Sequence, residues 1–390
     1  MILGFDLCSV RGGDRFDGHS AVVLNLASAL ERVAHECPVH LELYAPAGSV
    51  IPALGTNHLR AIRPWPLCSS PDRLVRYCLC TRLLVKAPSV FLNIASSPQL
   101  RFARCVRVSI VHDIAFMIDK WRSYYTEDLR RYLQENTEAA LRKAHGVIAV
   151  SNQTRDDLIR HFDLNPARVR VVYNGFDEAL FNTRAVSADQ LVIEKLGGGP
   201  YILSVGTIQP RKNYPLLIRS FSRLRRESDL PHRLVIVGAP GWLSEESITL
   251  AKQHAGDGVI LWGRAAVTEV PALMRHASAF VFPALYEGFG IPLVEAMACG
   301  APVVASNTGP VPEVLGGAGL LFDPLSEDGL LDALRNILTD SDLASRLRSR
   351  SLERAGAFSW DKAARECIDF AGRIAAMKDV PLKSRLTRHT

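Results

Sequence analysis

The strongest constraint on the fold is an alternation of short apolar runs with longer amphipathic segments, which continues through both halves of the 390-residue chain. This order is typical of βαβ units, in which helices cover a sheet of parallel strands. A domain usually has about 100–200 residues, so the length suits two domains with a cleft between them. We therefore expect an α/β protein of two doubly wound parallel-sheet (Rossmann-like) domains facing across a cleft.

The apolar runs and amphipathic segments place the expected elements. In the first half they predict strands at residues 2–6, 40–44, 90–94, 106–111, 146–150 and 169–173, and helices at 20–34, 127–144 and 153–161. In the second half they predict strands at 201–205, 233–237, 258–262, 279–282, 302–305 and 319–322, and helices at 215–227, 247–254, 267–276 and 293–299. Ligands of such sheets bind beyond the carboxyl ends of the strands.

The composition is that of an ordinary globular protein. Hydrophobic residues make up 48% of the chain and charged residues 22%, which excludes a disordered or collagen-like chain. No run of about 18 uncharged apolar residues occurs, and the start MILGFDLCSVRGGDRFDG reaches arginine and aspartate too early for a signal peptide. We therefore expect a cytoplasmic protein. The eight cysteines are scattered without zinc-ribbon spacing, and we expect them to be reduced.

The positive charge gathers in one segment. Residues 51–110 contain nine basic residues and one acidic residue, Asp72, so nine minus one leaves +8 in this segment, against +6 for the whole chain. Such a patch fits an anionic membrane surface or a pyrophosphate-bearing acceptor, and a solvated surface explains it equally well. Its aromatic residues lack the pattern of a stacking platform, so nucleic acid is not an expected partner. The basic residues are Arg60, Arg63, Arg73, Arg76, Arg82, Lys86, Arg101, Arg104 and Arg107.

The stretch PALYEGFGIPLVEAMACG, at residues 283–300, predicts a strand end, a glycine loop and a helix. Gly288 and Gly290 allow the backbone to approach a ligand closely, and the amides around 291–293 can hold an anion such as a phosphate ester. Glu287 and Glu295 can then accept hydrogen bonds from hydroxyl groups on either side of that anion. The alternative is that Glu295 is a capping or surface residue and that the glycines only turn the chain.

A second stretch, YILSVGTIQPRKN at residues 201–213, predicts a strand that turns at Gly206. It places Arg211 and Lys212 side by side just before a helix, where two cations suit a diphosphate. The alternative is a pair of surface cations in a polar loop.

These stretches resemble the GT-B-fold retaining glycosyltransferases of family 4 (group 1), and among them a mannosyltransferase-like branch that builds bacterial polysaccharides. The resemblance covers most of the chain and is weakest over residues 47–99, in the half that normally recognises the acceptor. In the second half it rests on SVGTIQPRKN, LWGRAAVTEVPALMRHASAFVFPALYEGFGIPLVEAMACGAPVVAS and FSWDKAA. In the first half it rests on VSIVHDIAF, RKAHGVIAVSNQTRDDL and VRVVYNGFD.

For the second half the resemblance implies a donor site with a role for each matched residue. Glu287 contacts the donor sugar and Glu295 holds the ribose, while Arg211 and Lys212 neutralise the departing diphosphate. Amides of the glycine loop hold the sugar and phosphate, and the backbone of the segment 262–264 lies beside the base. The remaining donor-binding residues are Gly206, Trp262, Arg264, Gly288, Phe289, Gly290 and Ile291.

For the first half the resemblance places Gly18 against the diphosphate and His112 at the sugar. The loop RGGDRFDGHSAVV is longer and more charged than a bare glycine turn, so Gly12 and Gly13 remain alternatives to Gly18. His112 follows an expected strand, where a ligand is expected, but a lone histidine there is often a structural hydrogen-bonding residue.

The expected domains are an N-terminal acceptor-side domain at 1–181, a linker at 182–200 and a C-terminal nucleotide-sugar-binding domain at 201–356. The linker NTRAVSADQLVIEKLGGGP is polar and ends in three glycines and a proline, which favours a hinge. Residues 357–390 are expected to form a helix that crosses back to the N-terminal domain.

The resemblance implies a retaining transfer of a hexosyl group, with GDP-mannose preferred over a UDP-sugar as donor. The expected acceptor is a glycan or a polyprenyl-diphosphate-linked acceptor, in the synthesis of a cell-surface polysaccharide such as O-antigen or exopolysaccharide. We expect no cofactor and no metal, because the one D-x-D, at 340–342, lies between helical patterns and reads as a helix cap. The alternatives are a sugar-nucleotide epimerase or phosphorylase on the same fold, and a non-catalytic sugar-nucleotide-binding subunit.

Overall fold

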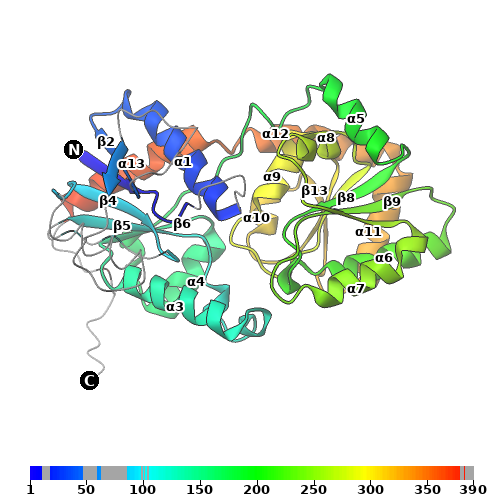
Figure 1. Ribbon diagram of the computed structural model, residues 1–390, viewed down its shortest axis with the longest axis horizontal. Coiled ribbons are helices and arrows are strands. Elements are labelled where there is room, and N and C mark those ends of the chain that lie inside the picture. Colours follow the sequence, from blue (N-terminus) through cyan, green and yellow to red (C-terminus); the bar gives the residue numbers. More distant parts are fainter. Residues whose placement is uncertain are drawn as a thin grey trace. The chain divides into compact units, whose positions relative to one another are not determined.

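The computed structural model describes residues 1–10, 18–46, 59–62, 86–97, 100, 102, 105–377 and 382. The chain divides into two compact units. Unit 1 comprises Met1–Ile114, Asp128–Gly175 and Trp360–Thr390, and unit 2 comprises Ala115–Glu127 and Phe176–Ser359. Each unit is a parallel sheet covered by helices (Figure 1).

Among the described residues, the sheet of unit 1 has the strand order β3-β2-β1-β4-β5-β6-β7, and every pairing is parallel. The chain order reverses between β1 and β4, which makes this the switch point of a doubly wound sheet. The strands are β1 (Ile2–Asp6), β2 (His40–Pro46), β3 (Leu59–Ile62), β4 (Val90–Ile94), β5 (Val106–Val111), β6 (Gly146–Ala149) and β7 (Val169–Val171). The helices are α1 (Gly18–Ala34), α3 (Glu127–Leu141), α4 (Asn152–Phe162) and α13 (Trp360–Ala376).

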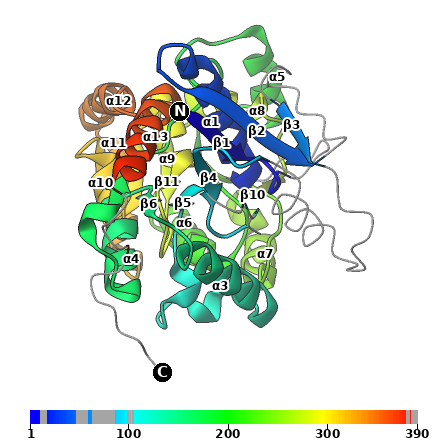
Figure 2. The same cartoon turned by 90° about the vertical axis from the view of Figure 1, so that its left-hand side faces the viewer.

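The last helix of the chain, α13, lies beside the first, α1, in both views (Figures 1 and 2). Its apolar face packs so closely on the sheet that a Cβ added to Gly146 of β6 would lie 2.7 Å from Ile374 Cγ1. Two ion pairs, Arg32–Asp361 at 2.6 Å and Arg365–Glu36 at 2.7 Å, join its exposed side to the N-terminal part. Exposed pairs contribute little, so apolar burial carries this contact.

In the described part of unit 2, the strand order is β10-β9-β8-β11-β12-β13, again parallel throughout. The strands are β8 (Tyr201–Val205), β9 (Arg233–Val237), β10 (Val259–Gly263), β11 (Ala279–Phe282), β12 (Val303–Ser306) and β13 (Gly319–Phe322). The helices are α5 (Ser187–Lys195), α6 (Tyr214–Glu227), α7 (Glu245–Gln253), α8 (Glu269–His276), α9 (Ile291–Ala298), α10 (Val311–Leu315), α11 (Glu327–Thr339) and α12 (Ser341–Ala355). Helices α6, α7 and α11 cover one face, and α5, α8, α9 and α12 lie on the other (Figure 1).

The expected α/β class with two doubly wound parallel sheets is confirmed, as are most strand positions, with strand bounds that agree within two residues. Strand β3, at the edge of the sheet, was missed because it is short and carries arginine. The segment 182–200, expected to be an interdomain linker, contains α5 and falls within unit 2. Helix α5 is fixed to α8 by a buried pair, Asp189–Arg275 at 2.6 Å, with side chains 5% and 7% exposed.

Three further observations concern the described part of the chain. The cysteines there, Cys8, Cys37, Cys105, Cys299 and Cys367, are free thiols. No helix within it combines the length and apolarity that a membrane crossing requires. Most of the basic segment 51–110 lies outside the described residues.

Candidate functional site

The two loops singled out from the sequence follow neighbouring strands of unit 2. Arg211 and Lys212 come after β8, and Glu287 comes after β11, which pairs directly with β8. The chain order of the sheet reverses between these two strands, since β8 has β9 on its other side. Ligands of doubly wound sheets bind at this switch point, so the fold brings both motifs to the expected edge.

A buried ion pair joins the two loops. Lys212 Nζ lies 2.6 Å from Glu287 Oε1, and each side chain is only 10% exposed. Burial acts to raise the pKa of Glu287, but the charges of Lys212 and Arg211 outweigh it and hold that pKa below its ordinary value. The backbone reinforces the contact, because the Leu285 amide donates to the Arg211 carbonyl at 2.8 Å. Glu287 is therefore an ionised carboxylate that positions a cation.

Two glycines make room for this pair. A Cβ added to Gly238, after β9, would lie 2.0 Å from the carbonyl oxygen of Gly206. A Cβ added to Gly206 would lie 3.2 Å from Lys212 Cε. The Gly206 carbonyl also accepts a hydrogen bond from Tyr214 Oη at 2.9 Å. The Lys212 side chain thus lies across a backbone that only glycine allows to approach this closely.

Helix α9 begins directly after the second loop. Gly290 is its N-cap with φ 98°, a left-handed conformation that favours glycine, and Pro292 occupies its first turn. Pro292 has no N–H, and the Leu293 amide donates to the Gly290 carbonyl at 2.9 Å. Of the amides expected around 291–293, Ile291 is therefore the candidate anion donor.

Glu295 lies within α9 and is partly buried. Burial, with a smaller effect from the charge of Asp177, raises its pKa to about 8. At neutral pH this carboxyl is largely protonated, so it can both donate and accept hydrogen bonds to a pair of hydroxyl groups. The interpretation of Glu295 as an exposed surface glutamate does not fit this environment.

The other predicted residues of unit 2 surround these loops or lie further along the sheet edge. Phe289 is buried, with its ring 5.6 Å from that of Phe358. Trp262 and Arg264 lie at the carboxyl end of β10, two strands from β8. The Trp262 ring faces the ammonium of Lys195 at 4.5 Å, and Arg264 is exposed.

In unit 1, Gly18 begins α1 and His112 directly follows β5. Gly12 and Gly13 lie outside the described residues. Burial, with a smaller effect from His19, lowers the pKa of His112 to about 3, so its imidazole is neutral. The two histidine rings are 6.3 Å apart, and the His112 carbonyl accepts from Thr154 Oγ1 at 3.2 Å.

Two polar residues at this edge of unit 1 were not predicted from the sequence. His19 follows Gly18 in the first turn of α1, and its Nε2 lies 3.4 Å from Ser97 Oγ, just after β4. The sequence signal that could have found them is their position, because residues that follow parallel strands or begin the next helix lie at the same edge of the sheet. This edge of unit 1 therefore carries a second cluster of hydrogen-bonding groups.

Among the described residues, no three His, Cys, Asp or Glu side chains are placed to bind one ion, and a reaction without a metal stays a prediction. The D-x-D at 340–342 is a helix cap as interpreted, because Asp340 Oδ1 accepts from the Leu343 amide at 2.8 Å at the start of α12.

Solved structures of other proteins share this fold. Sucrose-phosphate synthase from Thermosynechococcus elongatus superposes with a TM-score of 0.73 at 21% identity, covering 96% of this chain and 99% of that one. Anabaena HepE in complex with UDP and glucose gives a TM-score of 0.72 at 18% identity, covering 96% and 100%. At these identities the likeness shows the fold, which is the GT-B fold.

Sequence comparison then gives the family. Residues 16–180 match "Glycosyltransferase Family 4" and residues 189–354 match "Glycosyl transferases group 1". O-antigen chain mannosyltransferase B of Escherichia coli is 31% identical over 265 residues, which are 67% of this chain and 69% of that protein. The chain belongs to the family 4 (group 1) glycosyltransferases, and it is a glycosyltransferase.

Two further relatives differ in length or substrate. The serotype-specific mannosyltransferase WbdA of E. coli is 28% identical over 273 residues, 68% of this chain but 33% of that protein. A Campylobacter jejuni enzyme is 30% identical over 233 residues, 58% of this chain and 60% of that protein. Its name describes transfer of N-acetylgalactosamine to a diphospho-undecaprenol-linked sugar.

Proposed function

We propose that this protein is a retaining mannosyltransferase that moves mannose from GDP-mannose to a glycan acceptor during the synthesis of a cell-surface polysaccharide such as O-antigen or exopolysaccharide. The observation that carries the proposal is the buried Lys212–Glu287 pair, 2.6 Å apart at the switch point of unit 2, with Arg211 beside it. A nucleoside diphosphate is the leaving group that such a site suits, because its negative charge grows as the sugar–phosphate bond breaks.

The proposed chemistry is stabilisation of that leaving group. Arg211, Lys212 and the N-terminal end of α9 supply positive charge without rearranging during the reaction, and one such donor contributes about 10²–10³ in rate. Glu287 fixes Lys212 and offers its remaining acceptor positions to sugar hydroxyls. Glu295, partly buried and with a raised pKa, is proposed to hold the ribose.

Neutralisation by these groups is proposed to need no metal. Transfer should therefore continue at full rate when EDTA is added to the purified enzyme. A loss of activity with EDTA that Mg²⁺ or Mn²⁺ restores would contradict this part of the proposal.

The choice of mannose rests on relatives. The E. coli proteins named above are mannosyltransferases of O-antigen synthesis or of serotype specificity. A panel of GDP- and UDP-sugars, scored by thermal shift, tests the donor, because a bound ligand raises the melting temperature by mass action. GDP-mannose should give the largest shift, and Lys212→Met should reduce it. A larger shift with a UDP-sugar would contradict the assignment of GDP-mannose as donor, but it would not contradict the assignment of the donor site.

A lipid-linked acceptor is proposed from the C. jejuni relative, whose substrate is a diphospho-undecaprenol, and from the +8 charge of residues 51–110. Such an acceptor would place the enzyme peripherally on the cytoplasmic face of the membrane. Co-sedimentation with anionic vesicles should be strong at low salt and weak at high salt. Absence of binding at low salt would remove this proposal.

A further inference from the structure

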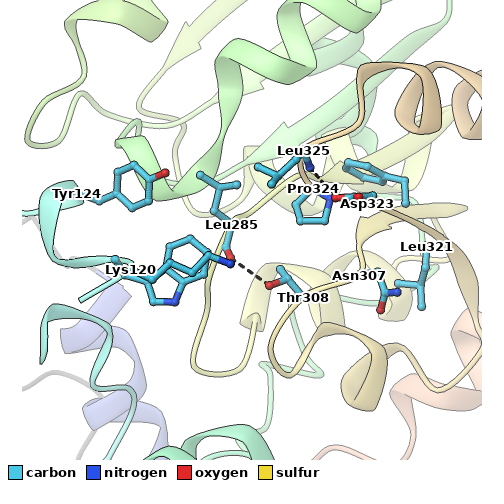
Figure 3. Close-up of a pocket in the computed structure, with 11 residues that line it drawn as sticks. Lys120, Tyr124, Leu285, Asn307, Thr308, Leu321, Asp323, Pro324 and Leu325 are labelled. Atoms are coloured by element: carbon cyan, nitrogen blue, oxygen red, sulfur yellow. Dashed lines mark hydrogen bonds between the residues drawn. The ribbon is translucent and has the colours of Figure 1, made fainter. Parts of the chain in front are cut away.

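Unit 2 contains a pocket beside the Lys212–Glu287 site that none of the predicted donor residues lines. Its volume is about 610 Å³, and it opens at the carboxyl ends of β12 and β13 (Figure 3). One wall comes from the segment Ala115–Glu127, and the other from the loops after β11, β12 and β13. Its lining residues are Lys120, Trp121, Tyr124, Leu285, Asn307, Thr308, Leu321, Phe322, Asp323, Pro324 and Leu325.

The first wall is aromatic and firmly held. The Trp121 ring stacks on Tyr124 at 6.0 Å with 29° between the planes and contacts Tyr286, next to Glu287, at 5.8 Å. Trp242 holds the segment in place, because its Nε1 donates to the Tyr124 carbonyl at 2.6 Å. Trp121 is therefore a fixed aromatic surface of the pocket rather than a loose surface residue.

The opposite wall carries short polar groups on a rigid backbone (Figure 3). Thr308 Oγ1 donates to the Leu285 carbonyl at 3.1 Å. The backbone N–H of Asn307 donates to the Phe322 carbonyl at 2.7 Å. Asp323 Oδ1 accepts from the Leu325 amide at 2.9 Å. The side chains of Asn307 and Asp323 are exposed, so they can exchange bonds with water for bonds with a ligand.

This combination suits a neutral sugar. A pyranose presents C–H groups on its faces and hydroxyl groups around its edge, which complement an aromatic surface flanked by amide, hydroxyl and carboxylate groups. A phosphate fits poorly, because one cation, Lys120, and one anion, Asp323, lie in the lining and the Lys120 ammonium already sits 4.4 Å over the Trp121 ring.

The pocket and the donor site are joined through the backbone of one residue, Leu285. Leu285 donates its amide to the Arg211 carbonyl at 2.8 Å and accepts from Thr308, so one residue contacts both. We propose that this pocket is a binding site for sugar residues of the glycan acceptor, built on the donor-binding unit with Trp121 as its platform. The assignment of the sugar as acceptor rests on the proposed function, whereas sugar binding itself does not.

The test measures sugar binding without any donor. The full chain is titrated with methyl α-mannoside and α-mannobiose, followed by tryptophan fluorescence and saturation-transfer NMR, and with GMP in parallel. Trp121→Ala should weaken sugar binding about three- to ten-fold, the size of one good aromatic contact, while Trp121→Phe keeps most of it. Asp323→Asn and Asn307→Ala should also weaken sugar binding. Both residues are exposed, so these variants can be used in the test if Trp121→Ala does not fold.

Two controls separate this proposal from the proposed function. Asp332→Asn, an exposed carboxylate on α11 outside the pocket, should leave sugar binding unchanged. Lys212→Met should reduce transfer by about 10²–10³ yet keep sugar binding. With GDP-mannose present, the pocket variants should raise the acceptor KM. The proposal would be overturned if the wild-type protein bound no sugar, or if the pocket variants bound sugar within two-fold of wild-type affinity. It would also be overturned if GMP bound in a way that depends on Trp121 and displaced the sugar.

Discussion

At the scale of single residues, the arrangement of Lys212 and Glu287 decides how this site works. Both side chains are nine-tenths buried, so each charge depends on its partner for compensation. Because the pKa of Glu287 is lowered, the stability that it contributes is present above the ordinary carboxyl pKa and is lost as the pH falls. The pair therefore serves the fold as well as the proposed reaction, and a mutation must separate these roles.

A pair of variants can do so. Lys212→Met leaves Glu287 buried without this partner and should lower the free energy of unfolding by about 3–5 kcal/mol. It should also reduce kcat/KM by about 10²–10³. In the double variant Lys212→Met, Glu287→Leu, most of the stability should return in urea unfolding while activity stays lost. Recovery of activity together with stability would show that the pair has a structural role alone.

Glu295 predicts a pH dependence of the opposite sign. Its pKa rises from an ordinary 4.5 to about 8, so between these values the folded protein binds more protons than the unfolded chain. Stability from this group is thus greatest at low pH and falls as the pH rises towards 8. Glu295→Gln should flatten the measured unfolding free energy between pH 5 and 8, and Glu246→Gln, exposed on α7, should not. An unchanged slope in Glu295→Gln would contradict the raised pKa.

At the scale of elements, the switch point follows from the sequence more readily than the contacts within it. Alternating apolar and amphipathic segments predict β8, β11 and their loops, so Arg211 and Glu287 were expected at one sheet edge. Their spacing could not show that Lys212 is buried against Glu287, because that contact depends on how the loops after β8 and β11 pack against each other. The contacts of His19 with His112 and Ser97 could not be predicted for a similar reason, since they depend on the packing of α1.

The approach of β8 and β9 can be tested at one glycine. Gly238→Ala places a methyl group 2.0 Å from the Gly206 carbonyl oxygen. The nearest atoms are all backbone atoms, which cannot turn aside as a side chain can, so the ends of β8 and β9 must separate. We expect destabilisation of about 1–3 kcal/mol or more and weaker donor binding, measured by urea unfolding and thermal shift. Gly256→Ala is the matched control, because an added Cβ there meets nothing within 4 Å. Equal effects of the two variants would refute this role for Gly238.

At the scale of the whole molecule, the unit to which a segment belongs does not follow simply from its position along the chain. Composition suggested a hinge at 182–200, yet α5 forms there because Asp189 finds a buried partner, Arg275, on α8. Such a long-range pair leaves no local signal in the sequence. Similarly, Ala115–Glu127 follows a strand of unit 1 but belongs to unit 2, where it forms the aromatic wall of the pocket.

The C-terminal helix gives a prediction at this scale. Truncation after Ser359 removes α13 and uncovers the apolar faces of α1 and β6 that Phe370 and Ile374 cover. We expect loss of amide-exchange protection in unit 1 and partial retention in unit 2, which has its own core. Truncation after Leu382, which keeps the bond from the Asn165 amide to the Leu382 carbonyl, should preserve protection in both. Full protection of unit 1 without α13 would contradict this role.

We propose retaining transfer of mannose by a site in which Arg211 and Lys212 stabilise the leaving diphosphate. The most direct measurement is NMR of the product formed from GDP-α-mannose and a mannose-terminated acceptor. We predict stoichiometric GDP and a new α-linked mannose, both lost in Lys212→Met. A β-linked product, or transfer that survives in Lys212→Met at near wild-type rate, would contradict the account.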